Sequence, residues 1–393
     1  KALIFVGINV AKDKHDCFIL NSEGTVLADV FTIANNRIGF ETLLSRIQSC
    51  SQGESKIKVG LEATGHYSYN LLGFLLDSGL ATYVINPLHT NLYRKSLSQR
   101  RNKTDRRAAR TIAMMLMSDV DLKSYSNTAY HNEELKSLTR YRFDKVKERA
   151  KLKSSVARLV NILFPELEKL VSSLHIAVVY ALLSNYPGAS YIANANTEEL
   201  AETLCTASKG RYTKSKTAEI QVAAGVSIGS KMPAKSMELK HTIALIREQD
   251  KEISEVESAI DKITSQMDSP IFTIPGIGRH MGAMILAEVG DFSNFSSADT
   301  LLALAGLSPS TYQSGQLQNC YAHMEKRGSR YLRYALFNAA KYVCLWCPTF
   351  SAYLEKKRSE GKHYNVAISH AAKKLVRRIF AMQRSGKAFL ADY

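Results

Sequence analysis

Two acidic side chains occupy positions where a strand ends or a helix begins. Glu62 follows the apolar segment 56–61, so it is expected at the edge of a sheet, where ligands usually collect. Asp105 opens a predicted helix whose next turn brings Ala108 onto the same face, and Asn9 lies near the end of the first predicted strand. Phosphodiester chemistry on Mg²⁺ needs several converging carboxylates, because the ions must neutralise the attacking and leaving oxygens. By itself, a single Glu after a strand is more often a polar cap than a metal ligand.

A serine in a glycine turn suggests a second kind of chemistry. Ser314 precedes Gly315, where a serine can be exposed on a sharp turn, but it needs a base or a metal to become a nucleophile. No base is evident nearby in the sequence, so an ordinary turn serine is the alternative. Tyr312 would suit a tyrosine recombinase, yet no convincing Arg-His-Arg arrangement surrounds it.

Four residues of the C-terminal part have a spacing that superficially suggests a zinc ribbon. They are Cys320, His323, Cys344 and Cys347. The segment 331–346 is predicted to be helical, and nothing around Cys320 predicts a zinc knuckle. We therefore favour ordinary packing of these cysteines over a zinc site.

Basic residues are concentrated in the tracts 94–110 and 356–387, and Asp105 is the only acid of the first tract. Aromatic residues within or beside the tracts offer stacking surfaces for unpaired bases, namely Tyr93, Tyr353, Tyr364 and Phe380. In the first tract, the cations expected to bind nucleic acid are Arg100, Arg101, Lys103, Arg106, Arg107 and Arg110. Binding through several phosphates should weaken as salt rises. If it does not, the tracts are solvated surface.

The composition is that of a folded protein with a polyanionic partner. The 393 residues exceed the usual size of one domain, so two or three cores are expected. Lys and Arg total 52 against 36 Asp and Glu, and the net charge of +16 favours nucleic acid as the partner. No apolar run approaches the roughly 20 residues of a membrane span, and the chain begins in a strand-like pattern. We expect a cytoplasmic protein without membrane contact.

The candidate acids require an α/β domain to bring them together. Three strands in succession, followed by alternating helix and strand, indicate a mixed sheet in the order expected of a ribonuclease-H-like fold. The predicted strands cover 3–9, 15–20, 25–31, 56–61 and 82–85, and the predicted helices cover 38–47 and 69–76.

The middle of the chain predicts two long helices. Near-heptad spacing of apolar residues starts at Leu135 and stops at Phe164 and Pro165, and a second such helix covers 239–263. Together they predict an antiparallel coiled coil. Residues from about 170 to 235 are rich in Ala, Ser, Thr and Lys and are interpreted as a small helical insert.

The C-terminal unit starts at Ile271 with a glycine turn. Gly276 and Gly278 precede a predicted helix over 281–288, which resembles a helix-hairpin-helix whose backbone N–H groups approach a DNA phosphate. A plain tight turn is the alternative. A later basic segment, suited to phosphates or simply solvated, contains Lys326, Arg327, Arg330 and Arg333.

The acidic motifs are similar to those of a transposase family. Segments 6–10, 60–65 and 102–110 resemble the motifs of the insertion-sequence one-ten family, the Piv-type DEDD transposases. The family pattern is G-I-D, then E-A-T-G, then N-K-T-D-x-x-D-A. Glu62 and Asp105 match this pattern, whereas Asn9 and Ala108 stand where the family has aspartates.

The C-terminal unit extends the resemblance. Segments 305–309 and 312–315 are similar to the A-G-L-x-P element and the serine-glycine motif of the family, and 326–329 resembles a third motif. The resemblance implies a bacterial protein with a RuvC-like DEDD domain over 1–125, a coiled coil with its insert over 126–268, and a C-terminal transposase domain over 269–393.

The resemblance also implies a mechanism and partners. Mg²⁺ bound by Glu62, Asp105 and the aspartates normally at positions 9 and 108 would activate Ser314, which would join covalently to DNA. The acids and the serine would come from two domains, or from two subunits of a homodimer or homotetramer on donor and target DNA. Insertion-sequence members resemble systems in which an RNA guide bridges the two DNAs, whereas Piv-type relatives invert a DNA segment.

Two replaced acids predict that this chain is an inactive variant, whether engineered or naturally decayed. Asp-to-Asn and Asp-to-Ala changes remove a metal ligand while keeping the fold. Two other functions stay open. One is a Holliday-junction nuclease, which would use the acids without Ser314, and the other is a decayed transposase that only binds nucleic acid.

Overall fold

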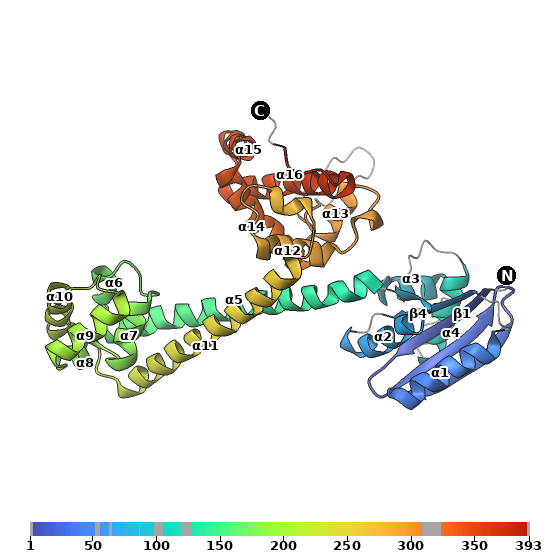
Figure 1. The fold of residues 1–393 in the computed structure, drawn as a ribbon, viewed down its shortest axis with the longest axis horizontal. Helices are drawn as coiled ribbons and strands as arrows, with labels where there is room; N and C mark the ends of the chain where they lie inside the picture. Colours follow the sequence, from blue (N-terminus) through green and yellow to red (C-terminus); the bar gives the residue numbers. More distant parts are fainter. Residues whose placement is uncertain are drawn as a thin grey trace. The chain divides into compact units, whose positions relative to one another are not determined.

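The computed structural model describes residues 3–51, 56–62, 65–85, 87–97, 105–118, 127–308 and 324–390 (Figure 1). The chain divides into two compact units, residues 1–134 and 135–393. The finer division into three domains at 125/126 and 268/269 stays a prediction.

The first unit is built on a five-stranded mixed sheet in the order β3-β2-β1-β4-β5. Its first three strands are antiparallel neighbours, and β1, β4 and β5 run parallel. The strands are β1 (Leu3–Val10), β2 (Lys14–Asn21), β3 (Val26–Ala34), β4 (Lys56–Glu62) and β5 (Ala81–Ile85). The predicted α/β domain with a mixed sheet is therefore confirmed.

Helices cover both faces of the sheet. On one face, α1 (Arg37–Cys50) and α2 (Tyr69–Asp77) bury leucines and aromatic residues against the inward side chains of β1 and β4. On the other face, α4 (Asp105–Met117) packs on Phe5 and Phe18. A short 3-10 helix, η1 (Gly65–Ser68), precedes α2, and α3 (Pro87–Leu97) follows β5.

A glycine lets α4 approach the sheet closely. A Cβ atom on Gly7 would lie 2.1 Å from the Ala109 carbonyl oxygen and 2.5 Å from the Ala113 nitrogen. Both neighbours are backbone atoms of α4, so neither can move away unless the helix itself shifts. Gly7 thus sets the distance between β1 and the helix that begins at Asp105.

We expect Gly7→Ala to lower the free energy of unfolding by about 1–3 kcal/mol, because the added methyl group must displace α4. Denaturant unfolding followed by circular dichroism measures the change. Gly225→Ala is the matched control, since a Cβ there meets nothing within 4 Å. Equal stability of the two variants would contradict this account of the packing.

The two predicted long helices are α5 (Asn127–Leu163), which belongs to the second unit from Leu135 on, and α11 (Pro233–Thr264). Ion pairs between them run in opposite order along the two helices: Arg142–Glu257, Lys145–Glu252, Arg149–Asp250 and Arg158–Glu238. The helices are therefore antiparallel, as predicted. Their apolar seam includes Leu159, Leu163, Leu239 and Ile243.

A helical insert connects these two helices. It comprises α6 (Leu167–Leu170), α7 (Ala177–Asn185), α8 (Ala189–Ala193), α9 (Thr197–Ser208) and α10 (Lys214–Gly225). Leu183, Leu200 and Ile220 share one apolar core with the coiled-coil residue Leu163. The predicted helical insert is thus present, and its core is continuous with that of the coiled coil.

The elements described in the C-terminal part are helices joined by turns and loops. Its elements are η2 (Pro270–Thr273), α12 (Arg279–Val289), η3 (Phe292–Asn294), α13 (Ala298–Leu304), α14 (Arg330–Trp346), α15 (Pro348–Ser359) and α16 (Tyr364–Ser385). α14 packs against α12, α15 and α16 and shares one apolar core with them. None of the helices within the described ranges is long and apolar enough to cross a membrane.

Two cysteines of the suggested zinc ribbon lie in this core. Cys344 and Cys347 are buried among apolar side chains and are free thiols. Burial, with a smaller effect of Cys347, raises the pKa of the Cys344 thiol to about 11, which disfavours the thiolate that zinc requires. Cys320 and His323 lie outside the described residues.

Candidate active site and nucleic-acid interface

The carboxyl ends of β1 and β4 bring Asn9 and Glu62 next to each other. The parallel register pairs Ile8 with Leu61, the residues just before them. Side chains alternate along a strand, so Asn9 lies on the same face as Gly7, the face that α4 covers. Asn9 is only 8% exposed, and Glu62 is half-buried.

The first turn of α4 lies toward this edge of the sheet. Ala109 contacts β1 at Gly7, and the later residue Leu116 packs in the cluster that contains Phe5, so the helix starts on the Asn9 side. Ala108 is buried in this first turn. Asp105 is the first residue of α4, and its side chain lies outside the described residues. The fold thus gathers all three acidic motifs at one edge.

Asp16 is a further acid at this edge that the sequence analysis missed. The antiparallel register places Asp16 directly opposite Asn9, so the two side chains share a face. Asp16 is 8% exposed, and one of its carboxylate oxygens accepts a hydrogen bond from Thr32 Oγ1 at 2.6 Å. The pairing of β1 with β2 was the available signal, because a turn over 11–13 puts position 16 opposite position 9.

The donors at this edge do not make up a metal site in the chain as it stands. An amide at Asn9 and a methyl group at Ala108 replace two acids of the family pattern. Among the described residues, no group of three or more His, Cys, Asp or Glu side chains is placed to hold a metal ion. The residues present therefore do not fit the pair of Mg²⁺ ions that such phosphoryl transfer uses.

The residues that precede and follow the segment of Ser314 are hydrogen-bonded to each other. Ser314, with all of 309–323, lies outside the described residues. On either side of it, the Glu325 N–H donates to the Ser308 carbonyl at 3.2 Å, and the Ser329 N–H donates to the Leu304 carbonyl at 2.8 Å. The end of α13 and the start of α14 are thus joined by backbone hydrogen bonds.

A buried carboxylate holds the start of α14. Glu288 of α12 accepts hydrogen bonds from Arg140 Nε at 2.6 Å and Arg140 Nη2 at 3.0 Å. It also accepts from Ser329 Oγ, which in turn accepts from the Leu332 N–H as the N-cap of α14. Burial alone would raise the pKa of the Glu288 carboxyl, but the hydrogen bonds from Arg140 and Ser329 and the charges of Arg140 and Lys136 hold it below its usual value.

The basic residues that follow this segment differ in their exposure and in their hydrogen bonds. Lys326, Arg327 and Arg330 are exposed, and Arg330 Nη2 donates to Tyr331 Oη at 2.7 Å. Arg333 is half-buried, and its Nη1 donates to the carbonyls of Ala305 and Lys326. Arg333 therefore ties two loop segments together, and the exposed cations are the better candidates for phosphate contacts.

Of the other basic residues predicted to bind nucleic acid, two are exposed on α4 and the side chains of the rest lie outside the described residues. Arg107 and Arg110 are exposed on α4, and the Arg110 guanidinium lies 5.5 Å from the centre of the Phe18 ring. Arg100, Arg101, Lys103 and the side chain of Arg106 lie outside the described residues.

The two glycines of the predicted hairpin have different surroundings. Gly276 has a φ of 91°, and a Cβ there would lie 2.6 Å from the backbone of Tyr342. Gly278 is the N-cap of α12, and no atom lies within 4 Å of its would-be Cβ. Gly276 thus serves close packing with α14, and only at Gly278 is there room for a phosphate.

Comparisons with known proteins agree with the motifs. Residues 6–165 match a DEDD model of the IS110 type described as a transposase, and residues 268–355 match the model described as "Transposase IS116/IS110/IS902 family". Together the two matches cover more than half of the chain.

Relatives align along nearly the whole chain. A protein of insertion element IS116 from Streptomyces clavuligerus is 25% identical over 98% of this chain and 96% of its own length. A pilin gene-inverting protein from Moraxella bovis is 24% identical over 98% and 97%. The mini-circle putative transposase for IS117 from Streptomyces coelicolor is 27% identical over 93% and 90%. With both family models and these full-length relatives, the chain belongs to the IS110 family of insertion-sequence transposases.

Proposed function

We propose that the chain is a DNA recombinase in which a RuvC-like acidic edge and Ser314 cut and join DNA strands. The observation that carries this proposal is the meeting of three distant motifs, at Asn9, Glu62 and the first turn of α4, on one face of the sheet. The sheet order, with three antiparallel strands beside two parallel ones, supports a RuvC-like fold. As it stands, the chain lacks the activity because two of the four acids are replaced.

The proposed covalent step uses the Ser314 hydroxyl. Its oxygen attacks a DNA phosphorus, the bond from phosphorus to the 3′ oxygen breaks, and the serine proton leaves to solvent or a base while the 3′ oxygen takes up a proton. The resulting 5′-phosphoserine ester keeps the energy of the broken bond. A 3′-hydroxyl of another strand then attacks this ester, which rejoins DNA and frees the serine.

The serine and the acids belong to different parts of the chain, so the proposed site is composite. We propose that a homodimer or homotetramer completes it, with Lys326, Arg327 and Arg330 positioning the DNA backbone through its phosphates. The partners are donor and target DNA, and the protein acts in the bacterial cytoplasm. Mg²⁺ belongs to the site only when all four acids are present.

Two modes of target choice are consistent with the family. Relatives from insertion elements support transposition, for which we propose that an RNA of the element pairs with both DNAs. The pilin gene-inverting protein of Moraxella bovis supports inversion of a DNA segment, for which we propose that no guide is needed. Sequencing the nucleic acid that copurifies with the chain at moderate salt separates the two. A discrete RNA supports guidance, and DNA alone supports inversion.

The test of the activity is the double variant Asn9→Asp, Ala108→Asp. We expect it to cleave and join the DNA that flanks its own element in the presence of Mg²⁺, with products on a sequencing gel that the original chain does not form. Adding Glu62→Gln to this variant should remove the products again, because the same edge of the sheet is used. If the double variant folds and binds DNA but forms no product, the chain is a nucleic-acid-binding protein only.

A further inference from the structure

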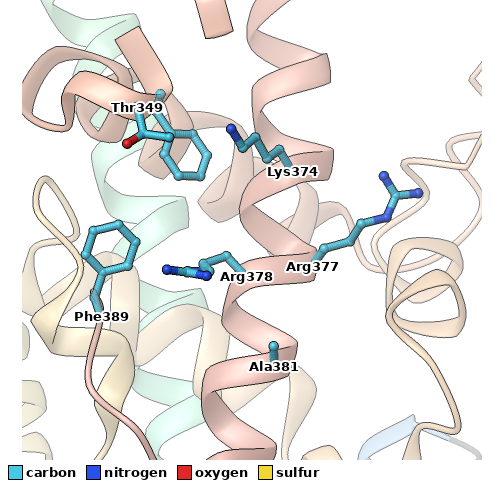
Figure 2. Close-up of a pocket in the computed structure, with 7 residues that line it drawn as sticks. Thr349, Lys374, Arg377, Arg378, Ala381 and Phe389 are labelled. Carbon is cyan, nitrogen blue, oxygen red and sulfur yellow. The ribbon is translucent and has the colours of Figure 1, made fainter. Parts of the chain in front are cut away.

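A cavity of about 280 Å³ lies in the C-terminal basic tract (Figure 2). It is bounded by the start of α15, the middle of α16 and the segment that follows α16. The residues that matter for its chemistry are Phe350, Lys374, Arg377, Arg378 and Phe389. Most of them lie beyond residue 355, where the second family match ends.

The cavity is strongly positive. Lys374 Nζ lies 5.2 Å from the centre of the Phe350 ring and 4.9 Å from that of Tyr353, and no carboxylate of the described residues pairs with it. The helix that supplies Lys374 contains no acid and five cations, namely Lys373, Lys374, Arg377, Arg378 and Arg384. The surroundings therefore favour an anion.

The cavity also has an aromatic wall in a fixed position. The backbone N–H of Phe389 donates to Thr273 Oγ1 at 2.8 Å, which anchors the segment after α16. Arg378 is directed toward the Phe389 ring, with its guanidinium carbon 5.3 Å from the ring centre (Figure 2), and its Nη2 donates a hydrogen bond to the Leu390 carbonyl. Arg377 points the other way and pairs with Asp299 at 3.2 Å. A ligand thus meets one ring and the Lys374 ammonium, and the hydrogen-bonded Arg378 adds positive charge.

A ring beside two cations, in a cavity of this size, suits a base joined to a phosphate. The volume lies just below the range of about 300–1,000 Å³ for small-molecule sites, so a duplex cannot enter. Aromatic rings stack bases of any sequence, and cations hold the phosphate. A base can enter such a site only when it is unpaired or turned out of its helix.

We propose that this cavity binds a single unpaired nucleotide of a DNA or RNA strand, with its base against Phe389 and its phosphate on Lys374. The proposal rests on the proposed function in one respect, namely that nucleic acid contacts the C-terminal part of the chain. It requires no cutting or joining.

Binding of short fluorescein-labelled oligothymidylate to the full chain, measured by fluorescence anisotropy, tests this. We expect Phe389→Ala to weaken single-strand binding roughly 5- to 100-fold, the range for loss of one stacked base, and to leave duplex binding unchanged. Lys374→Met should weaken single-strand binding more than Lys387→Met, which removes the same charge from a residue that does not line the cavity. Equal effects of the two lysine variants on single-strand binding would overturn the proposal.

Photocrosslinking of the unaltered chain gives a test that does not depend on a variant. Oligonucleotides with 5-iodouracil, one of DNA and one of RNA, are irradiated on the protein and the crosslinked peptide is identified by mass spectrometry. We expect a crosslink at Phe389, from either strand if both enter and from one if the cavity is selective. Crosslinks confined to other peptides would overturn the proposal, and either result is independent of strand joining.

Discussion

Replacing Ser314 with alanine in the acid-restored chain is expected to abolish the covalent protein–DNA adduct and all joined product. The serine oxygen is the atom proposed to bond to phosphorus, and alanine has no group that can replace it. Loss of a nucleophile of this kind costs on the order of 10³-fold or more in rate. Denaturing gel electrophoresis of protein bound to labelled DNA measures the adduct directly.

Two neighbouring substitutions serve as controls for this variant. Ser310→Ala removes a hydroxyl from the same segment, and Tyr312→Phe removes the nucleophile of a tyrosine recombinase, so both should keep the adduct. An adduct that persists in Ser314→Ala would place the nucleophile elsewhere. Cleavage without any adduct, in both the restored chain and its Ser314→Ala variant, would instead favour the Holliday-junction nuclease, which attacks with water.

The sheet could be predicted from the sequence because its order depends on local patterns. Alternating apolar residues and turn signals gave all five strands, and the motif at Glu62 falls where β4 ends. The helix α3 was missed because its residues 87–97 combine weak apolar spacing with several polar and basic side chains. Tyr93 of this helix packs against Ile85 and Ile112, a contact that only the tertiary structure provides.

Parts of the candidate site depend on pairing between distant segments, which the motifs alone do not specify. Asp16 became a candidate only through its register with Asn9. Arg333 was predicted to bind nucleic acid from its charge, but its position is set by two backbone carbonyls. The cavity at Lys374 needs the segment after α16 to return to Thr273, and no motif in the sequence indicates that return.

The ion pair between α5 and α12 leads to the second large effect. We expect Arg140→Met to lower the free energy of unfolding by roughly 3–5 kcal/mol, because it leaves the Glu288 carboxylate buried without its main partner. The Glu288 side chain is 1% exposed, whereas that of Arg140 is 39% exposed. Glu288→Gln should therefore cost less, since the arginine left behind can be hydrated.

Arg158→Met is the matched control for this prediction. It makes the same substitution on the same helix, but the Arg158–Glu238 pair is 52% and 39% exposed, so about 1 kcal/mol or less is expected. Urea unfolding of both variants at neutral pH gives the comparison. Equal losses of unfolding free energy in the two variants would show that burial of the Glu288 carboxylate does not increase the cost of removing its partner.

The pH dependence of the Arg140→Met effect provides an independent check. The pKa of Glu288 is lowered in the folded protein, so the ion pair contributes its full stability above the unfolded pKa of about 4.3 and loses it as the pH falls through the folded pKa. The stability difference between the original chain and Arg140→Met should therefore shrink on acidification, whereas that for Arg158→Met should stay small throughout.

Because Glu288 also holds Ser329 at the N-cap of α14, beside the segment of Ser314, we expect the acid-restored chain with Arg140→Met to lose strand joining at temperatures where it is still folded. Joining at the unaltered rate by a folded Arg140→Met chain would show that this carboxylate stabilises the fold without positioning the serine segment.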